Sequence, residues 1–313
     1  NLLYFDMLEK NTNSLLNTFD DRHQNVFIAN IYAQDFIVKG YTAEWSVHYN
    51  IDEPSTEYDR NLFLARPDAI GDALEHEVRA LYLGFAGEGH WGKLNVSHFF
   101  YHAFGDDSFN NIAGRDVDID AFAFGLELSV DDDWVRYRFS FLHASGDSKP
   151  EDDEAEGFDA ILPNPNFVGG RNSYWIKQAV PLAGTSVQMV NQDSVFPSLR
   201  SSKLQGQANF VNPGITIFNV GLDLNLTPKV RGTLNLSKLM FDATESLELV
   251  LNQSGIDEDI GVDLSMGIEW RPWLNNNVIM DLGTNVLFPG EGFQDILTDG
   301  NLYSVTSRLV FTY

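Results

Sequence analysis

The chain has 313 residues and no cysteine, and its formal net charge is −25 at pH 7. The lack of cysteine excludes a disulfide scaffold and a thiolate metal site, and so acidic a chain is a poor partner for nucleic acid. No run approaches the roughly 18 apolar residues of a membrane helix. A membrane location is still open, because barrel strands hide their apolar residues in alternation with polar ones.

Segments of period two recur along the chain and predict about twelve β-strands of on the order of ten residues each. From Phe218 to Leu226 every second residue is apolar, and polar residues or glycine stand between them. The segment from Val262 to Arg271 is divided in the same way. The expected strands are residues 2–9, 25–36, 40–50, 78–87, 92–104, 119–130, 134–145, 215–227, 230–241, 260–271, 277–288 and 303–313.

The last of these segments ends the chain on an aromatic residue, Tyr313. The face that carries Tyr313 is otherwise apolar except for Ser307, while Arg308 lies on the opposite, polar face. A final strand with one apolar face and a terminal aromatic residue is typical of outer-membrane β-barrels, in which that face contacts lipid.

The connections between the expected strands alternate between short and long. Short ones lie at residues 38–39, 89, 131–133, 228–229 and 272–276, and long ones at 10–24, 51–77, 105–118, 146–214, 242–259 and 289–302. Most of the negative charge falls in the long connections. Tight periplasmic turns and long external loops are typical of outer-membrane barrels. We therefore expect long loops outside the cell, with the short turns and the C-terminus in the periplasm.

These patterns predict an all-β fold, a transmembrane antiparallel up-and-down β-barrel in the bacterial outer membrane. The expected organisation is a single domain over residues 1–313 with about twelve strands. The long loop at residues 146–214 is expected to fold into or over the pore. Whether twelve strands close the barrel, or a segment preceding Asn1 adds more, is left open by the sequence.

Several motifs in the second half of the chain point to a family. They are SGD at Ser145–Asp147, FDAILPNPNFVGG at Phe158–Gly170, NFVNPG at Asn209–Gly214, RPWLNNN at Arg271–Asn277 and LFPGEGF at Leu287–Phe293. In these motifs the chain resembles the alginate-export-like family of outer-membrane barrels. The resemblance implies a barrel that passes a solute across the outer membrane, in a family whose barrels tend to have more strands than the sequence predicts here.

Charged residues at the polar positions of the strands are the candidate pore lining. In lipid such charges are costly, so they must face a watery lumen or one another. They could form a selectivity lining with a transverse field for a charged solute, or a lattice of salt bridges that fills a narrow barrel. The two signs are nearly balanced, whereas a polyanion such as alginate would favour a strongly cationic lumen. The candidates are Glu44, Glu88, Glu127, Arg136, Arg138, Asp223, Arg231, Asp263, Glu269, Arg271, Asp281 and Arg308.

The connection at residues 146–214 is roughly 70 residues long, which is far beyond the usual length and indicates a functional or a disordered segment. Its middle is too apolar for a disordered tail. We expect it to form a constriction that involves Arg171, Tyr174, Trp175 and Lys177. A lid packed on other loops without any role in gating is the alternative.

The function predicted from the sequence is that of a porin or channel for passive passage of small polar or charged solutes. A structural barrel that serves as sheath or anchor for a partner, such as a multihaem cytochrome or an exported polymer, is the alternative. No catalytic motif, cofactor or metal site is predicted. The expected partners are outer-membrane lipid, lipopolysaccharide and the solute, and a protein partner inside or beside the barrel is left open.

Overall fold

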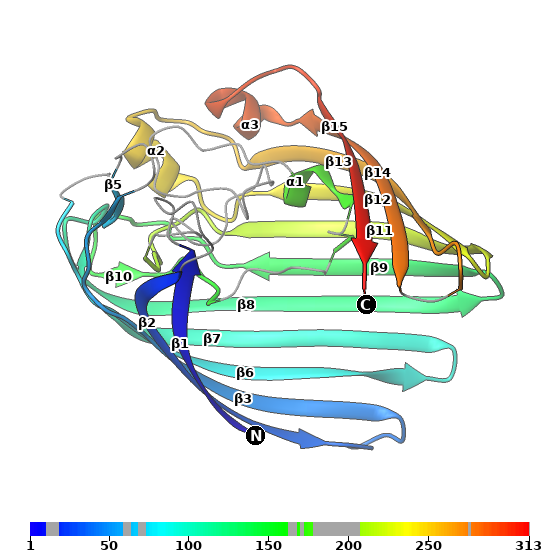
Figure 1. Ribbon diagram of the computed structural model, residues 1–313. Helices are drawn as coiled ribbons and strands as arrows, with labels where there is room; N and C mark the ends of the chain where they lie inside the picture. The colour runs from blue at the N-terminus through cyan, green and yellow to red at the C-terminus, as the bar shows by residue number, and fades with distance from the viewer. Residues whose placement is uncertain are drawn as a thin grey trace.

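The computed structural model describes residues 1–10, 19–58, 64–67, 73–161, 168–169, 172–177, 207–274 and 277–312. Its main feature is one antiparallel sheet in which every long strand pairs with its neighbours in chain order (Figure 1). The strands are β1 (Leu2–Lys10), β2 (Phe19–Ala33), β3 (Tyr41–Asp52), β6 (Val78–Trp91), β7 (Leu94–Asn110), β8 (Arg115–Asp132), β9 (Val135–Ala144), β11 (Ile215–Thr227), β12 (Val230–Met240), β13 (Asp259–Trp270), β14 (Val278–Pro289) and β15 (Leu302–Phe311). The predicted all-β, up-and-down antiparallel fold is confirmed.

The remaining elements are short. The two-residue strand β10 (Glu154–Ala155) pairs in parallel with β8 and is the thirteenth strand of the sheet. Strands β4 (Glu57–Tyr58) and β5 (Leu64–Arg66) form a separate hairpin. The helices are α1 (Tyr174–Lys177), α2 (Glu245–Leu251) and α3 (Glu291–Ile296). Within the described ranges, no helix is long and apolar enough to cross a membrane.

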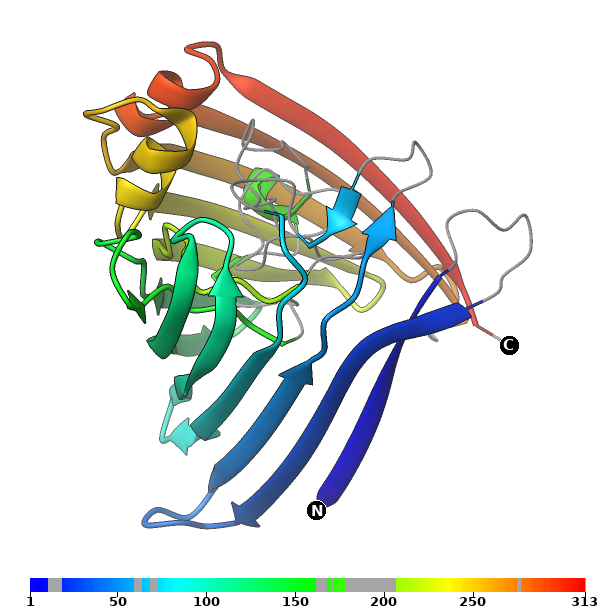
Figure 2. The same cartoon turned by 90° about the vertical axis from the view of Figure 1, so that its left-hand side faces the viewer.

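The sheet curls around a concave interior, and β1 and β15 are its two edges (Figure 2). No backbone pairing joins these two strands in the described part of the chain. The short connections lie at one end of the strands, and the long connections, with α2, α3 and the β4–β5 hairpin, lie at the other (Figure 1). These are called here the turn end and the loop end.

The prediction of a long connection at residues 105–118 is wrong. Residues 105–118 are mostly strand, because β7 continues to Asn110 and β8 begins at Arg115. The acidic residues after the turn follow the period of a strand. Val117 and Ile119 are buried, whereas Asp116 and Asp118 between and beside them are exposed. The two strands therefore form a hairpin that extends past its neighbours.

The two faces of the sheet have opposite character. On β13, Met266 is 55% exposed on the convex face, while Ser265 beside it is 2% exposed on the concave face. An exposed apolar face and a buried polar face invert the arrangement of a water-soluble sheet. The same inversion extends over several strands, whose exposed apolar residues include Phe27, Ile31, Trp45, Leu83, Phe100, Phe122, Phe139, Val220, Leu236, Leu264, Ile268, Leu282 and Val305.

The concave face changes along the strands. Toward the loop end it is apolar, and it is covered by described parts of the 146–214 segment. Trp175 and Phe210 of that segment are 2% and 1% exposed. They belong to one hydrophobic cluster with wall residues that include Val78, Ala80, Tyr82, Val117, Ile119, Ala121, Ile215, Ile217, Leu239, Ile260 and Leu287. Toward the turn end the concave face is polar and charged. The boundary between these two zones positions the candidate site.

Candidate functional site

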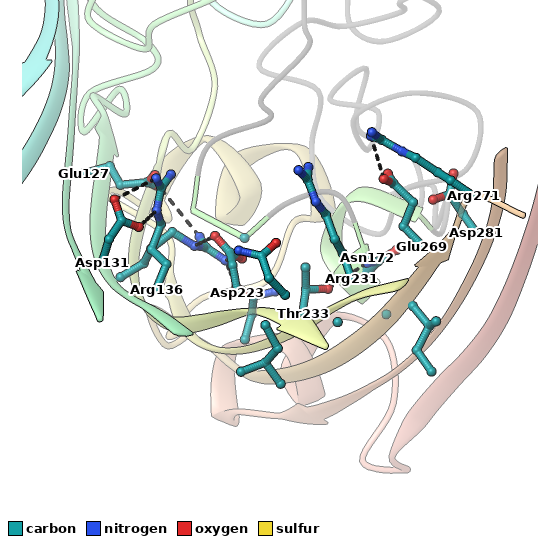
Figure 3. A pocket seen from close by; sticks show the side chains of 18 residues that line it. Glu127, Asp131, Arg136, Asn172, Asp223, Arg231, Thr233, Glu269, Arg271 and Asp281 are labelled. Atoms are coloured by element: carbon teal, nitrogen blue, oxygen red, sulfur yellow. Dashed lines mark hydrogen bonds and ion pairs between the residues drawn. The ribbon is translucent and has the colours of Figure 1, made fainter. Parts of the chain in front are cut away.

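A cavity of about 440 Å³ lies on the concave face at the turn end (Figure 3). Strands β8, β9 and β11 to β14 supply most of its wall, and residues 169 and 172 of the 146–214 segment complete it. Eight of the residues predicted to line a pore lie around it: Glu127, Arg136, Arg138, Asp223, Arg231, Glu269, Arg271 and Asp281. We refer to this cavity as the charged chamber.

Strand register explains why charges that are far apart in sequence meet here. Asp131 on β8 lies opposite Arg136 on β9, and Arg136 lies opposite Asp223 on β11. Asp223 in turn lies opposite Thr233 on β12. In an antiparallel sheet directly opposed residues share a face. The period of two that exposes apolar residues on the convex side therefore brings this row of polar residues into the chamber.

Two arginines on β9 are held by carboxylates on their neighbours. The Arg136 guanidinium contacts the two Asp131 oxygens at 2.5 and 3.0 Å. Arg138 donates to the two oxygens of Asp223 at 2.9 and 3.0 Å. It also donates to the side-chain oxygen of Asn235 at 2.8 Å and lies 3.6 Å from Glu127. Such forked contacts fix the orientation of a guanidinium.

On the other side of the chamber the pattern repeats. Arg271 lies 2.7 Å from Glu269. Arg308, on the edge strand β15, donates two hydrogen bonds to one oxygen of Asp281, at 2.9 and 2.6 Å. Arg231 differs from these arginines, because it forms no ion pair with any residue in the described ranges. Figure 3 shows its side chain extending from β12 into the cavity.

Asn172 of the 146–214 segment reaches the chamber and ties that segment to the wall. Its side-chain amide donates to the Thr233 hydroxyl at 3.1 Å, and Asn285 donates to its backbone carbonyl at 2.9 Å. Gly267 and Gly283 are directly opposed on β13 and β14 beneath it. A Cβ at Gly267 would collide with the Asn172 side chain, so the absence of side chains at these positions makes room for the segment.

Asp263 was predicted to line the pore, but the 146–214 segment covers it. Asp263 is 1% exposed and accepts a hydrogen bond from the Trp175 backbone N–H at 3.0 Å. Tyr174 and Trp175 are themselves buried, so two of the four predicted constriction residues lie against the wall. Arg171 is outside the described residues, and for Lys177 only the backbone position in α1 is described.

Two predicted lining residues lie away from the chamber. Glu44 on β3 accepts a hydrogen bond from Asn30 at 2.9 Å. Glu88 on β6 is exposed and lies opposite Thr42 and Ser97, which places it on the polar face of its strand. Both carboxylates belong to the β2–β7 side of the concave face.

A buried polar cluster at the loop end was missed in the sequence. Asp52 and Arg66 form an ion pair in which both side chains are fully buried. Asp52 also accepts the backbone N–H of Ala208 at 3.1 Å, and the Gln207 amide donates to the carbonyls of His76 and Asp52 at 2.6 and 3.1 Å. This cluster binds the end of the 146–214 segment to the wall. We call it the latch.

Asp159, within the same segment, provides a second attachment. Its carboxylate accepts the backbone N–H of Asn209 at 2.9 Å, and its carbonyl accepts the Tyr82 hydroxyl at 2.8 Å. Tyr82 belongs to β6, so this contact again joins segment and wall. Sequence periodicity does not identify such contacts, because their partners lie in irregular backbone.

Asp147, just after β9, is fully buried, and its Oδ1 accepts the Lys149 N–H at 2.9 Å. Burial, together with the charges of Asp152, Glu156 and Glu245, raises its pKa to about 7. Asp147 is therefore a loop residue that can bind a proton near neutral pH, with Asp152 and Glu156 as nearby charges.

Among the described residues, no group of three or more histidines and acids is placed to hold a metal ion.

No protein-family model matches the chain, and no curated protein matches it. Solved structures with a similar course of the chain include a NanC porin (5% identity, 93% of this chain and 95% of that one, TM-score 0.34). They also include Salmonella typhi OmpF in complex with daunomycin (9%, 98% and 94%, 0.37) and the Pseudomonas putida toluene transporter TodX (9%, 91% and 71%, 0.35). These sequence identities and TM-scores are too low to assign a function to the chain.

Proposed function

We propose that this protein is an outer-membrane channel for passive passage of small polar or charged solutes. The observation that carries the proposal is the inverted sheet: its convex face is apolar and exposed, and its concave face holds a charged chamber of about 440 Å³. An apolar outer band and a polar interior are what a barrel needs to conduct water-soluble solutes through lipid. Passage of this kind requires no cofactor and no chemical step.

The proposed orientation places the turn end and the C-terminus in the periplasm and the long loops outside the cell. Four exposed tryptophans at or beside short connections support a membrane–water interface at the turn end: Trp91, Trp134, Trp270 and Trp273, which are 71%, 49%, 43% and 67% exposed. Tryptophan is enriched where membrane and water meet. In this orientation the convex face contacts outer-membrane lipid, and the acidic loops face lipopolysaccharide.

The 146–214 segment is proposed to be the constriction of this channel. Its described parts cover the concave face at the loop end, and Asn172 reaches the charged chamber. A solute would therefore pass through the concave interior on the side of the segment that faces away from the wall residues it packs against. The segment's contacts with Asp263, the latch and Asn285 hold the constriction in place.

Single-channel recording in planar bilayers tests this proposal. We expect the purified chain to give stepwise conductance, and a variant that lacks residues 164–184 to give larger steps. Absence of conductance in both proteins, with a far-UV spectrum typical of β-structure, would overturn the channel proposal. Unchanged steps in the deletion variant would remove the constriction role and leave the channel.

A structural barrel that serves as sheath or anchor for a partner, such as a multihaem cytochrome or an exported polymer, is the second candidate. The apolar packing at the loop end favours it, because Trp175 and Phe210 fill space that a wide pore would leave open. Co-purification of a stoichiometric partner, with no conductance from the chain alone, would support this function. The alginate-export-like resemblance stays a prediction, because no family model matches the chain. The chamber's charges are balanced, whereas a polyanion such as alginate would favour a cationic lining.

A further inference from the structure

We infer that Arg231 is the recognition residue of the charged chamber and that the chamber selects a small hydroxylated oxyanion, with a carboxylate or phosphate head group. The inference rests on the proposed channel function and gives it a substrate class. Among the described residues around the cavity, the pairing of charges leaves one cation, Arg231, for a solute.

The other arginines at the chamber are occupied. Arg136 is held by Asp131, Arg138 by Asp223 and Asn235, and Arg271 by Glu269. Arg308 is held by Asp281 on the neighbouring strand. The carboxylates in these pairs are neutralised by their arginines, and the remaining chamber carboxylate, Glu127, lies 3.6 Å from Arg138 and accepts a hydrogen bond from the Ser140 hydroxyl at 2.7 Å. A cationic solute would therefore have to compete with an existing partner at each carboxylate, whereas an anionic one would find Arg231 without an ion pair among the described residues.

Arg231 forms no such pair with the described residues, although Glu269 lies directly opposite it in the ladder. The Glu269 carboxylate lies 2.7 Å from Arg271 instead. The Arg231 side chain is exposed and extends into the cavity (Figure 3). A guanidinium presents a planar fork of donors that matches a carboxylate or a phosphate, and its positive charge strengthens both hydrogen bonds.

The surroundings of Arg231 suit hydroxyl groups on the same solute. The Thr233 hydroxyl, two residues along the same face, accepts from Asn172 and keeps its own proton to donate. The carboxylates of Asp223 and Glu269 also line the cavity and offer acceptor oxygens. One cation, one hydroxyl donor and several acceptors fit an acidic sugar-like solute better than an inorganic anion or an apolar molecule.

The test compares wild type, Arg231→Gln and the charge-matched control Lys229→Gln. Lys229 lies in the tight turn between β11 and β12 and does not line the chamber. Block of the single-channel current is recorded with glucose, glucuronate and glucose 6-phosphate, which share a ring and differ in head group. In Arg231→Gln we expect the half-blocking concentration of at least one anion to rise about tenfold, as for loss of a charge-assisted hydrogen bond.

Glucose should be affected little by either substitution, and Lys229→Gln should match wild type. The anion that loses affinity identifies the head group, carboxylate for glucuronate and phosphate for glucose 6-phosphate. Equal block of Arg231→Gln and wild type by both anions would overturn the inference and leave the channel intact.

Equilibrium dialysis of labelled glucuronate and glucose 6-phosphate against the detergent-solubilised proteins gives a readout that needs no conduction. Binding that depends on Arg231, in a protein that does not conduct, would support the recognition site and reject the channel. Binding that is the same in Arg231→Gln and wild type would reject the site. A failure of the recognition site and a failure of the channel therefore give different results.

Discussion

The backbone N–H of Trp175 donates a 3.0 Å hydrogen bond to the carboxylate of Asp263. This contact joins the 146–214 segment to the middle of β13, on the face that a barrel directs inward. Because both residues are buried, water cannot replace the hydrogen bond when it is lost. Disrupting this contact therefore tests whether it holds the segment against the concave face.

Replacing Asp263 with Ala should loosen the segment, because the Trp175 N–H loses its buried acceptor at a cost of about 1–3 kcal/mol. Single-channel recording should show larger or noisier conductance steps, and limited proteolysis should cut within residues 146–214 more rapidly. Asp263→Asn keeps a side-chain oxygen and serves as the matched control. Equal behaviour of the two variants would contradict the role assigned to this acceptor.

Gly267→Ala should destabilise the protein by about 1–3 kcal/mol, since its Cβ would collide with the Asn172 side chain. Gly232→Ala is the control, because the atoms nearest its added Cβ lie at 3.6 Å, an ordinary contact distance. Denaturant unfolding in detergent or in vesicles measures the difference. A Gly267→Ala variant as stable as Gly232→Ala would show that Asn172 does not occupy this position.

Stability should depend on pH through Asp147. Its pKa is raised to about 7 from an ordinary value of 3.8, so between these pH values the folded protein binds a proton that the unfolded chain releases. The free energy of unfolding should therefore fall as pH rises from about 4 to 7, by at most on the order of 4 kcal/mol. Denaturant titrations across this pH range measure the slope.

Asp147→Asn retains the oxygen that accepts the Lys149 N–H and removes the titrating group. It should flatten this part of the pH profile and be more stable than wild type above pH 7. Glu151→Gln, an exposed change of the same charge in the same loop, should keep the wild-type slope. An unchanged slope in Asp147→Asn would place the pH dependence elsewhere.

Arg66→Ala should be among the most damaging substitutions, because the buried Asp52 carboxylate loses the Arg66 guanidinium. Breaking a buried pair from one side costs about 3–5 kcal/mol. The double variant Asp52→Asn with Arg66→Met removes both charges and should be closer to wild type. Thermal unfolding of wild type, Arg66→Ala, Asp52→Asn, Arg66→Met and the double variant provides the measurement, and additive losses would argue against direct coupling of the pair.

The wall of the fold was predictable because alternation is a local property. Each of the twelve expected strands corresponds to a long strand of the sheet, and Phe218 to Leu226 shows why: side chains of opposite kinds point to opposite faces. The expected loop at residues 105–118 was wrong, because β7 continues to Asn110 and β8 begins at Arg115, so that most of these residues are strand.

The chamber was predictable in part. The alternation of side chains along each strand placed Glu127, Arg138 and Asp223 on the polar face. It could not identify the arginine without an ion pair, because pairing depends on the register between strands. The cover over Asp263 was not predictable, since it depends on long-range packing of irregular backbone. The directly opposed Gly267 and Gly283 were the available signal, because adjacent glycines in a sheet indicate close approach of another segment.

The 146–214 segment leaves and re-enters the sheet at the same place, because Ala144 and Ile215, on either side of it, are directly paired neighbours. The ladder between β9 and β11 therefore does not require the residues between them. The segment is a cassette in the topological sense: its length and sequence can diverge between related chains, or be exchanged by design, while the strand order and register of the wall stay the same. A single wall could then carry constrictions for different solutes.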